Sequence, residues 1–302
     1  MIIIFPPKRV LADSNRCEYN PFMEAFPFVA CITDFGSEDS YAGAMRGVLA
    51  GGLLRGSIID ITHDIPSGDI RRAGLVLWEA QPSFPQGTIF LVVVDPGVGG
   101  DRRAAIFRCP GCDVVCPDNG VATFLLERFP EFHAVEIHPV QNGAPPLSNT
   151  FHGRDLFAPA AVQLAAGKPL SAFGPVLSSP QRIPLPRFQG QADEGWEGEA
   201  LYSDHFGNII TSIGRISYDF RELSPWIRTG ARGGKIHPRA HVELDDGSSI
   251  PTGKTYADAG SGPGRIAIVG SSGLLEIASR QSPAGTDSTL KPGAGIRLVS
   301  PS

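Results

Sequence analysis

Residues 88–103 have the sequence TIFLVVVDPGVGGDRR. Residues 89–94 are all apolar and rich in β-branched side chains, as in a strand that is covered on both faces of a sheet. Gly87 precedes this run and Asp95-Pro96-Gly97 ends it. We therefore expect Thr88–Val94 to be a central strand that leads into a polar loop at its carboxyl end.

Strands and helices are expected to alternate around this strand. Short apolar runs predict strands, and apolar residues at helical spacing predict helices. The expected strands are Phe28–Thr33, Ser57–Ile61, Ala104–Arg108 and Val114–Val115, and the expected helices are Tyr41–Leu54, Asp69–Ala80, Gly120–Phe129 and Gly153–Ala166. This order predicts an α/β domain with a largely parallel sheet, whose ligands bind beyond the carboxyl ends of the strands.

The last third of the chain has a different pattern. Residues 167–190 are rich in Pro, Ser and Gly, which is typical of a connection between domains. Short alternating segments then predict a smaller all-β, barrel-like domain. These segments are Gly198–Tyr202, Asn208–Ile213, Ala240–Leu244, Arg265–Val269, Leu274–Ser279 and Gly295–Val299. We expect an N-terminal extension at 1–27, the α/β domain at 28–190 and the β-barrel-like domain at 191–302.

The composition excludes several classes of protein. Of the 302 residues, 42% are hydrophobic and 19% are charged, which is typical of a folded chain rather than a disordered one. The net charge of -5, without a long basic run, argues against a nucleic-acid partner. No apolar run approaches the roughly 18 residues of a membrane helix, and the apolar start at residues 2–5 is too short for a signal peptide. We expect a cytoplasmic protein with no membrane partner.

The cysteines favour the same compartment. Their number, five, is odd, and they do not form the framework of a secreted disulfide-rich domain. Cys109-Pro-Gly-Cys112, with Cys116 nearby, resembles half of a zinc knuckle, but no second pair of ligands follows at suitable spacing. A hairpin with a Pro-Gly turn is the favoured interpretation.

Two candidate clusters follow predicted strands. Asp34 lies at a strand end beside Gly36, where a carboxylate can accept two hydrogen bonds from a vicinal diol. Asp39 either joins this cluster or caps the helix from Tyr41. The loop from Asp95 to Arg102 is rich in glycine but lacks the Lys-Ser/Thr ending of a phosphate-binding loop. Arg102 instead pairs with Asp95, either in a cleft that orients the carboxylate or as a surface ion pair.

Two further clusters contain histidine, amide or carboxylate side chains. His152 opens a helix and has Gly153 beside it, which leaves room for a small molecule to approach; a structural role is equally open. Asp155 is suited to the first turn of that helix. Asp204 and Asn208 flank a glycine, where they either read the edge of a purine or form a turn, and the residues alone favour the turn.

Several uncommon strings occur together and in a fixed order. The strings are TDFG (33–36), DITH (60–63), VDPGVG (94–99), PDNG (117–120), TFHGRD (150–155) and DHFGN (204–208). In this respect the chain resembles the hydroxide adenosyltransferase family, relatives of the fluorinases and chlorinases.

The resemblance implies an α/β domain followed by a smaller β-barrel, usually in a homotrimer with its active sites at subunit interfaces. It implies S-adenosylmethionine as the substrate and no cofactor. Asp95, Arg102 and His152 match the family's water-activating triad. By position, the residues expected to bind substrate are Asp34 at the ribose diol, Asp39 and Ser271 at the methionine end, Asp204 and Asn208 at adenine, and Phe151.

This chemistry agrees with the residue types. A sulfonium leaves as a neutral thioether, so the enzyme's task is to position water, and a general base is typically worth about 10²–10⁴-fold. The products are adenosine and methionine. The first alternative is a halogenase, but the family's halogenases carry a neutral residue at the position of Asp95, and a carboxylate there repels halide.

Two alternatives of other classes remain. One is a metal-dependent hydrolase that uses His63, Asp64, Asp95, His152 and Asp155. The positive charge of Arg102 beside Asp95 argues against a metal cation at that carboxylate. The other is a sensor that binds S-adenosylmethionine or adenosine without turnover. The chain also departs from the family at Gly270 and Arg280, where Asn is common, and residues 218–239 are a candidate insertion.

Overall fold

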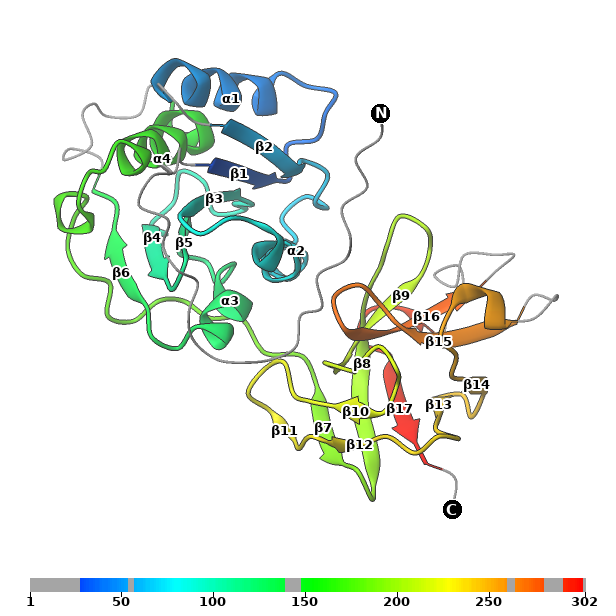
Figure 1. The fold of residues 1–302 in the computed structure, drawn as a ribbon. Coiled ribbons are helices and arrows are strands. Elements are labelled where there is room, and N and C mark those ends of the chain that lie inside the picture. Colours follow the sequence, from blue (N-terminus) through cyan, green and yellow to red (C-terminus); the bar gives the residue numbers. More distant parts are fainter. Residues whose placement is uncertain (1–27, 54–56, 139–147, 260–263, 280–289, 301–302) are drawn as a thin grey trace, which may run out of the picture.

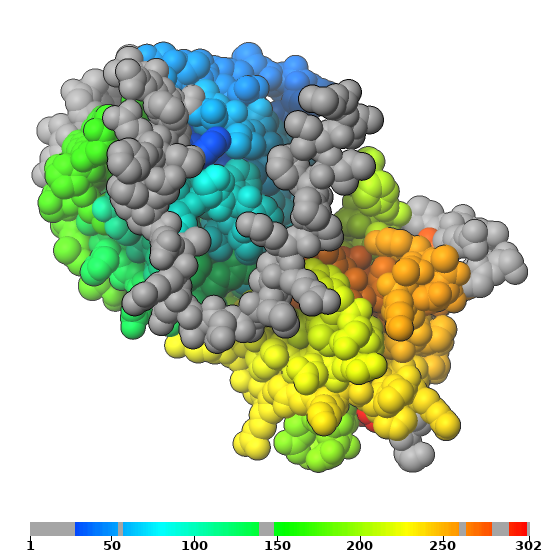
Figure 2. Space-filling model, in the orientation of Figure 1, coloured from blue at the N-terminus to red at the C-terminus, as the bar shows by residue number. Residues whose placement is uncertain are grey.

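The computed structural model describes residues 28–53, 57–138, 148–259, 264–279 and 290–300. The predicted extension at 1–27 and the departure at Arg280 lie outside these residues. The described residues contain two large sheets and a two-stranded one. Figure 2 shows two lobes, and together these observations confirm the general two-domain layout. The second sheet begins at β7 (Phe188–Gln191), and the division at residue 190 stays a prediction. Among the described residues, no helix is long and apolar enough to span a membrane.

The first sheet has the strand order β2-β1-β3-β5-β4-β6. Its bounds are β1 (Phe28–Thr33), β2 (Ser57–Thr62), β3 (Thr88–Val93), β4 (Ala104–Cys109), β5 (Cys112–Pro117) and β6 (His133–Glu136). The pairs β1–β2, β1–β3 and β3–β5 are parallel, whereas β4 runs antiparallel to both β5 and β6. The sheet is therefore mixed, with a parallel part that holds the predicted central strand, β3.

The mixed topology follows from the Cys109-Pro-Gly-Cys112 turn. Cys109 and Cys112 face each other at the end of the antiparallel β4–β5 pair, and Gly111 has a φ of +84°, which glycine adopts without strain. The predicted hairpin is thus confirmed. Because a tight hairpin reverses the chain, β4 cannot continue the parallel order.

Helices cover both faces of this sheet, as Figure 1 shows. They are α1 (Tyr41–Gly52), α2 (Ile70–Ala80), α3 (Thr123–Arg128) and α4 (Ala158–Ala165). Alternate residues of β1 point to opposite faces: Val29 packs with the core below α1 and α4, and Ala30 packs with the core below α2 and α3. All six residues of β3 are buried, as its apolar sequence predicts.

Two predicted helices differ from expectation at their beginnings. The helix expected from Gly120 starts at Thr123, because Gly120 has a φ of +95°. The helix expected from Gly153 begins with a π-helical turn, Gly153–Phe157, before α4. Pro159 follows this turn and has no N–H to donate to an α-helical partner, which favours the wider turn.

The second sheet is a nearly closed barrel. Its main path is β14-β13-β17-β8-β9-β16-β15, in which all neighbours are antiparallel. A bridge from Thr252 to Ala267 brings the two ends of the path together. The strands are β8 (Gly195–Ser203), β9 (Ile209–Gly214), β13 (His241–Leu244), β14 (Ser249–Pro251), β15 (Arg265–Val269), β16 (Leu274–Ser279) and β17 (Gly295–Val299).

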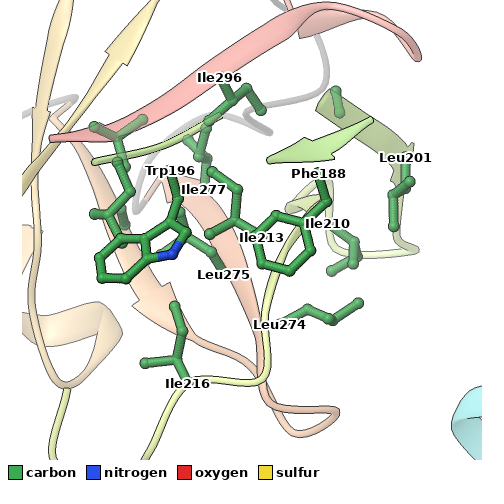
Figure 3. Close-up of a cluster of buried hydrophobic side chains, with 14 of the residues drawn as sticks. Phe188, Trp196, Leu201, Ile210, Ile213, Ile216, Leu274, Leu275, Ile277 and Ile296 are labelled. Atoms are coloured by element: carbon green, nitrogen blue, oxygen red, sulfur yellow. The ribbon is translucent and has the colours of Figure 1, made fainter. Parts of the chain in front are cut away.

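Short strands and a large apolar core complete this domain. The segment 218–239 contains β10 (Glu222–Leu223), β11 (Gly230–Ala231) and β12 (Gly234–Lys235). Trp196 and Phe188 lie among branched aliphatic side chains of several strands (Figure 3), and both are at most 2% exposed. The core of the barrel is thus filled by side chains and leaves ligand chemistry to its loops.

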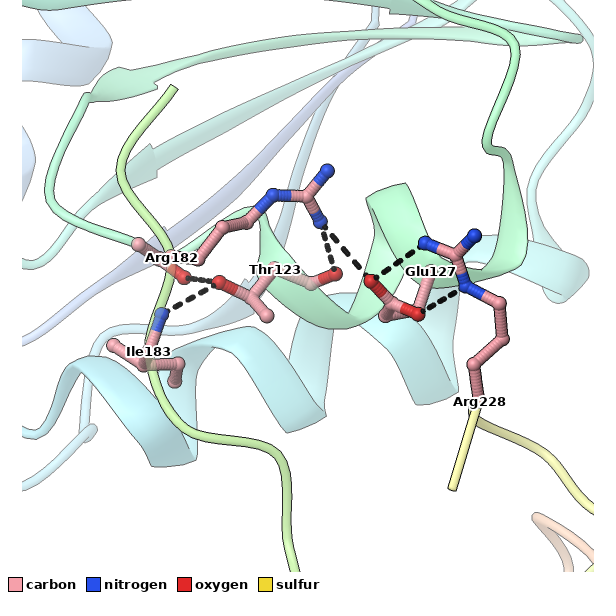
Figure 4. A network of polar contacts seen from close by, with 6 residues as sticks. Thr123, Glu127, Arg182, Ile183 and Arg228 are labelled. Atoms are coloured by element: carbon pink, nitrogen blue, oxygen red, sulfur yellow. Dashed lines mark hydrogen bonds and ion pairs between the residues drawn. The ribbon is translucent and has the colours of Figure 1, made fainter. Parts of the chain in front are cut away.

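The domains contact each other through α2 and α3. Trp78 of α2 packs on Trp226, with ring centroids 4.5 Å apart. Glu127 of α3 accepts hydrogen bonds from Arg182 and from Arg228 of the second domain (Figure 4). The Tyr202 hydroxyl donates to both oxygens of Glu79, at 2.7 and 2.9 Å. These contacts join the barrel to the side of the first sheet that α2 and α3 cover.

Candidate functional site

Two candidate carboxylates follow neighbouring parallel strands. Thr33 at the end of β1 pairs with Val93 at the end of β3. Asp34 follows directly after β1, and Asp95 follows Val94 after β3. The sheet therefore brings these two side chains to the same edge, where ligands of parallel sheets bind.

Asp95, Arg102 and His152 form one continuous set of contacts. Arg102 Nε donates to Asp95 Oδ1 and Oδ2 at 3.0 and 2.9 Å, and its Nη2 reaches Oδ2 at 2.5 Å. The same Nη2 lies 2.7 Å from Nδ1 of His152. The side chains of Asp95 and Arg102 are only 5% and 12% exposed. The structure thus brings together the three residues of the predicted triad.

The burial of the Asp95–Arg102 pair favours an orienting role. Desolvation largely offsets the Coulomb attraction of a buried ion pair, so such a pair contributes little net stability. A two-pronged contact does fix the plane of the carboxylate. The surface ion pair that the sequence left open is therefore excluded, and the pair holds Asp95 in a defined direction.

The contact with Arg102 also fixes the state of the His152 ring. Arginine can only donate hydrogen bonds, so Nδ1 of His152 must accept one and the proton of the neutral ring must be on Nε2. Burial, followed by the positive charge of Arg102, lowers the pKa of His152 from its ordinary value of 6.5. At neutral pH the ring is therefore uncharged and presents Nε2–H as a donor.

Gly153 is closely packed against an aromatic ring. A Cβ at this position would lie 2.8 Å from Cζ of Phe35, so the Phe35 ring occupies the space beside Gly153. The approach of a small molecule to His152 beside this glycine stays a prediction.

An aromatic cluster lies next to His152. The Phe151 ring contacts the rings of Phe35 and Tyr41 edge-on, with centroids 5.8 and 5.4 Å apart. The guanidinium of Arg154 lies 4.8 Å from the centre of the Phe151 ring. Tyr41 is 50% exposed, so the cluster has an open side. Sequence reasoning named Phe151 but missed Phe35 and Tyr41, because single aromatics look like ordinary core residues.

The remaining first-domain candidates have separate partners. Asp34 Oδ2 accepts the N–H of Gly68 at 2.8 Å, and the side chain is half-buried. Asp39 is exposed and does not cap α1, whose N-cap is Ser40. The capping interpretation of Asp39 is therefore wrong. Asp155 accepts from Arg154, and this hydrogen bond lowers its pKa.

The candidate metal ligands are not gathered. His63 Nδ1 contacts Thr33 Oγ1 at 2.8 Å, while Asp95 faces Arg102 and Asp155 faces Arg154. Within the described ranges, no three His, Cys, Asp or Glu side chains are placed to hold a metal ion. The geometry gives the metal-hydrolase alternative no support.

In the second domain, Asp204 and Asn208 form a turn. Asp204 Oδ1 accepts the N–H groups of Phe206 and Asn208, and its Oδ2 accepts from Asn208 Nδ2 at 2.9 Å. The turn interpretation is confirmed, and it leaves the role at adenine a prediction. Ser271 is exposed between β15 and β16, where its carbonyl accepts from Tyr218.

Glu276 is a buried acid that sequence reasoning missed. It is 7% exposed, and Tyr256, which also hydrogen-bonds Asn208, donates to it. Burial, followed by repulsion from Asp204, raises the pKa of Glu276 to about 7. A Cβ on Gly270 would lie 1.6 Å from Glu276 Oε1. A side chain at position 270 would therefore have to displace the Glu276 carboxyl from its present place.

Comparison with known proteins identifies relatives of both domains. Residues 29–174 match the SAM hydroxide adenosyltransferase N-terminal domain, and residues 198–297 match the corresponding C-terminal domain. A protein of Thermus thermophilus named (R)-S-adenosyl-L-methionine hydrolase is 35% identical over 89% of this chain and 98% of its own length. A fluorinase of Nocardia brasiliensis is 23% identical over 90% of this chain and 96% of its own length.

A solved structure shows the same fold. An uncharacterised conserved protein of Thermotoga maritima superposes with a TM-score of 0.76 at 30% identity, covering 90% of this chain and all of its own. Together with the two matched domains, this likeness confirms the resemblance seen in the sequence strings. The chain belongs to the S-adenosylmethionine hydroxide adenosyltransferase family.

Proposed function

We propose that this protein hydrolyses S-adenosyl-L-methionine to adenosine and L-methionine, by attack of water on the 5′ carbon of the ribose. The observation that carries this proposal is the buried contact of Arg102 with both Asp95 and His152, at a strand end in a chain of this family. An oriented carboxylate can accept a proton from a water molecule, and a neutral imidazole can hold that water through its Nε2–H.

The leaving group needs no acid, because the sulfonium departs as a neutral thioether. The water oxygen accepts from Nε2–H of His152 and donates one hydrogen to Asp95, which takes the proton as the C–O bond forms. Arg102 keeps the carboxylate in the required direction. General-base help of this kind is typically worth about 10²–10⁴-fold, and orientation contributes further.

Other residues would bind the substrate. In this proposal Asp34 holds the ribose hydroxyls, and Asp39 and Ser271 lie by the methionine end. Asp204 and Asn208 hold adenine from the second domain. Phe151, with Phe35 and Tyr41, lies beside His152 and offers the aromatic surface against which the nucleoside packs.

We further propose a homotrimer with active sites at subunit interfaces. The triad belongs to the first domain and Asp204–Asn208 to the second, and each set has its hydrogen bonds within its own domain. A site that uses both sets is completed by the second domain of a neighbouring subunit. Mixing Asp95→Ala and Asn208→Ala subunits would then restore some sites, and activity of the mixture above either variant tests the arrangement.

No cofactor enters the proposed reaction, since water is the nucleophile and a thioether is the leaving group. A cytoplasmic location is proposed from the cysteines, because the four that the structure describes are buried and form no disulfide bonds.

The test is product analysis by chromatography. The purified protein is incubated with S-adenosylmethionine of either configuration at sulfur, in halide-free buffer and in chloride. We expect adenosine and methionine in both buffers and loss of product in Asp95→Ala. Asp113→Ala should keep full activity, because it removes a carboxylate that pairs with Arg108 near the turn of the β4–β5 hairpin, away from Asp95. A 5′-chloro product would instead indicate a halogenase, and binding without turnover would indicate a sensor.

A further inference from the structure

The motif PDNG at residues 117–120 has no part in the proposed chemistry. It lies at the end of β5, and the sheet order places β5 between β3 and β4. The loop that carries Asp95 and Arg102 leaves β3 and enters β4, so it crosses over the end of β5. The motif therefore lies below the loop that carries two members of the triad.

Asn119 holds the first end of this loop. Its Nδ2 donates to the carbonyl of Val94 at 2.9 Å, and Val94 is the residue before Asp95. Its Oδ1 accepts the N–H of Val121 at 3.2 Å, which fixes the orientation of the amide. The Asn119 side chain thus ties the residue that precedes Asp95 to the end of β5.

Asp118 holds the other end. Its N–H donates to the carbonyl of Arg103 at 2.9 Å, and its Oδ2 accepts from Arg103 Nη2 at 2.6 Å. Its Oδ1 accepts the N–H of Gln181 at 2.8 Å. The Asp118 side chain is only 1% exposed, so water does not compete for these bonds. Arg103 follows Arg102 directly, so these contacts fix the backbone immediately after Arg102.

The loop is also packed along its length. A Cβ on Gly97 would lie 3.3 Å from Cγ of Arg102, and a Cβ on Gly99 would lie 2.7 Å from the carbonyl oxygen of Asn149. Asn149 lies three residues before His152. A displacement of either end of the loop therefore changes how Arg102 meets Asp95 and His152.

We propose that Asp118 and Asn119 are positioning residues, which fix both ends of the loop 95–102 and so set the geometry of Asp95, Arg102 and His152. This proposal rests on the proposed hydrolysis. Neither residue touches the reacting atoms in this account, and their effect is transmitted through Val94 and Arg103.

The test uses Asn119→Asp and Asp118→Asn, with Asp113→Asn as the matched control. Asn119→Asp replaces the donor to Val94 by an acceptor and keeps the size of the side chain. Asp118→Asn removes the charge that holds Arg103 but retains the acceptor for Gln181. Asp113→Asn removes an Arg–Asp pair at the opposite end of the same hairpin. We expect kcat to fall about 10- to 100-fold in the first two variants, with KM nearly unchanged and with the control like wild type.

A second measurement is independent of turnover. The titration of His152 is followed by its ring proton signals in NMR. Because Arg102 contributes to the lowered pKa of His152, we expect the midpoint to rise in Asn119→Asp and to stay unchanged in Asp113→Asn. If wild type shows no hydrolysis, the proposed function fails and this titration alone decides whether the loop is held as we infer.

Unchanged kcat and unchanged His152 titration in both variants would overturn the proposal. Equal losses in the Asp113→Asn control would also overturn it, because they would show a general loss of stability. If Asn119→Asp does not fold, Asp118→Asn is measured in the same way and decides alone.

Discussion

Replacing Arg102 by lysine tests orientation separately from charge. Arg102 makes three N–H contacts with Asp95 and one contact with His152, all from a planar guanidinium. A lysine ammonium keeps the positive charge but cannot span both oxygens of Asp95 and the His152 ring. At least two of the four contacts are therefore lost.

The size of the effect follows from these contacts. A hydrogen bond to a charged group contributes about 1.5 kcal/mol or more. If two such bonds orient Asp95 in the transition state, their loss raises the barrier by about 3 kcal/mol, which lowers kcat by roughly 100-fold. The substrate contacts are intact, so KM changes little.

The assay measures adenosine formation over a range of substrate concentrations. Arg108→Lys is the matched control, because Arg108 also binds an aspartate, Asp113, through a two-pronged contact, at 2.8 Å for both bonds. This pair is exposed and lies near the turn of the β4–β5 hairpin. A kcat for Arg102→Lys within about 3-fold of wild type, well below the loss estimated from the contacts, would refute the orienting role. Equal losses in both variants would refute the assignment to this site.

Four further outcomes are expected. Because burial and Arg102 lower the pKa of His152, the midpoint of the acid limb of kcat/KM should lie below pH 6.5; a midpoint above pH 7 would contradict the neutral ring. The pKa of Glu276 is raised to about 7, so the native state loses stability as pH rises from the ordinary value of 4.5 through 7, and Glu276→Gln should raise the Tm at pH 8 by several degrees but not at pH 5. Gly270→Ala should lower stability by about 1–3 kcal/mol in thermal denaturation, and by clearly less in a Glu276→Ala background. Prolonged dialysis against a chelator should leave the rate unchanged, and loss with recovery on adding a divalent metal would revive the metal-hydrolase alternative.

Much of the fold follows from local patterns in the sequence. The expected strand Thr88–Val94 agrees with β3 to within one residue, and Asp69–Ala80 agrees with α2, which Asp69 caps by accepting the N–H of Arg72. These elements are long or strongly apolar, so periodicity identifies them. The direction of β4 is a different matter: the hairpin was predicted, but the alternation of strands and helices favoured a parallel order that this hairpin breaks.

The short strands of the second domain were not predicted. β10, β11 and β12 have two residues each, too few to show a period of two. Their place depends on long-range pairing, such as that of β11 with β7.

The residues of the candidate site were likewise predicted only in part. Asp95, Arg102 and His152 are separated by up to 57 positions, from Asp95 to His152, and only the family resemblance linked them before the structure did. Glu276 was missed because its sequence neighbours are ordinary strand residues. Its unusual environment arises from Asp204 and Tyr256, which come from other parts of the barrel.

The central claim is that water attacks the ribose carbon, and isotope labelling tests it most directly. The reaction is run in water enriched in oxygen-18, and the products are examined by mass spectrometry. The account predicts one heavy oxygen in the 5′ hydroxyl of adenosine and none in methionine. Unlabelled adenosine, label in methionine, or a halogenated nucleoside as the product would contradict it.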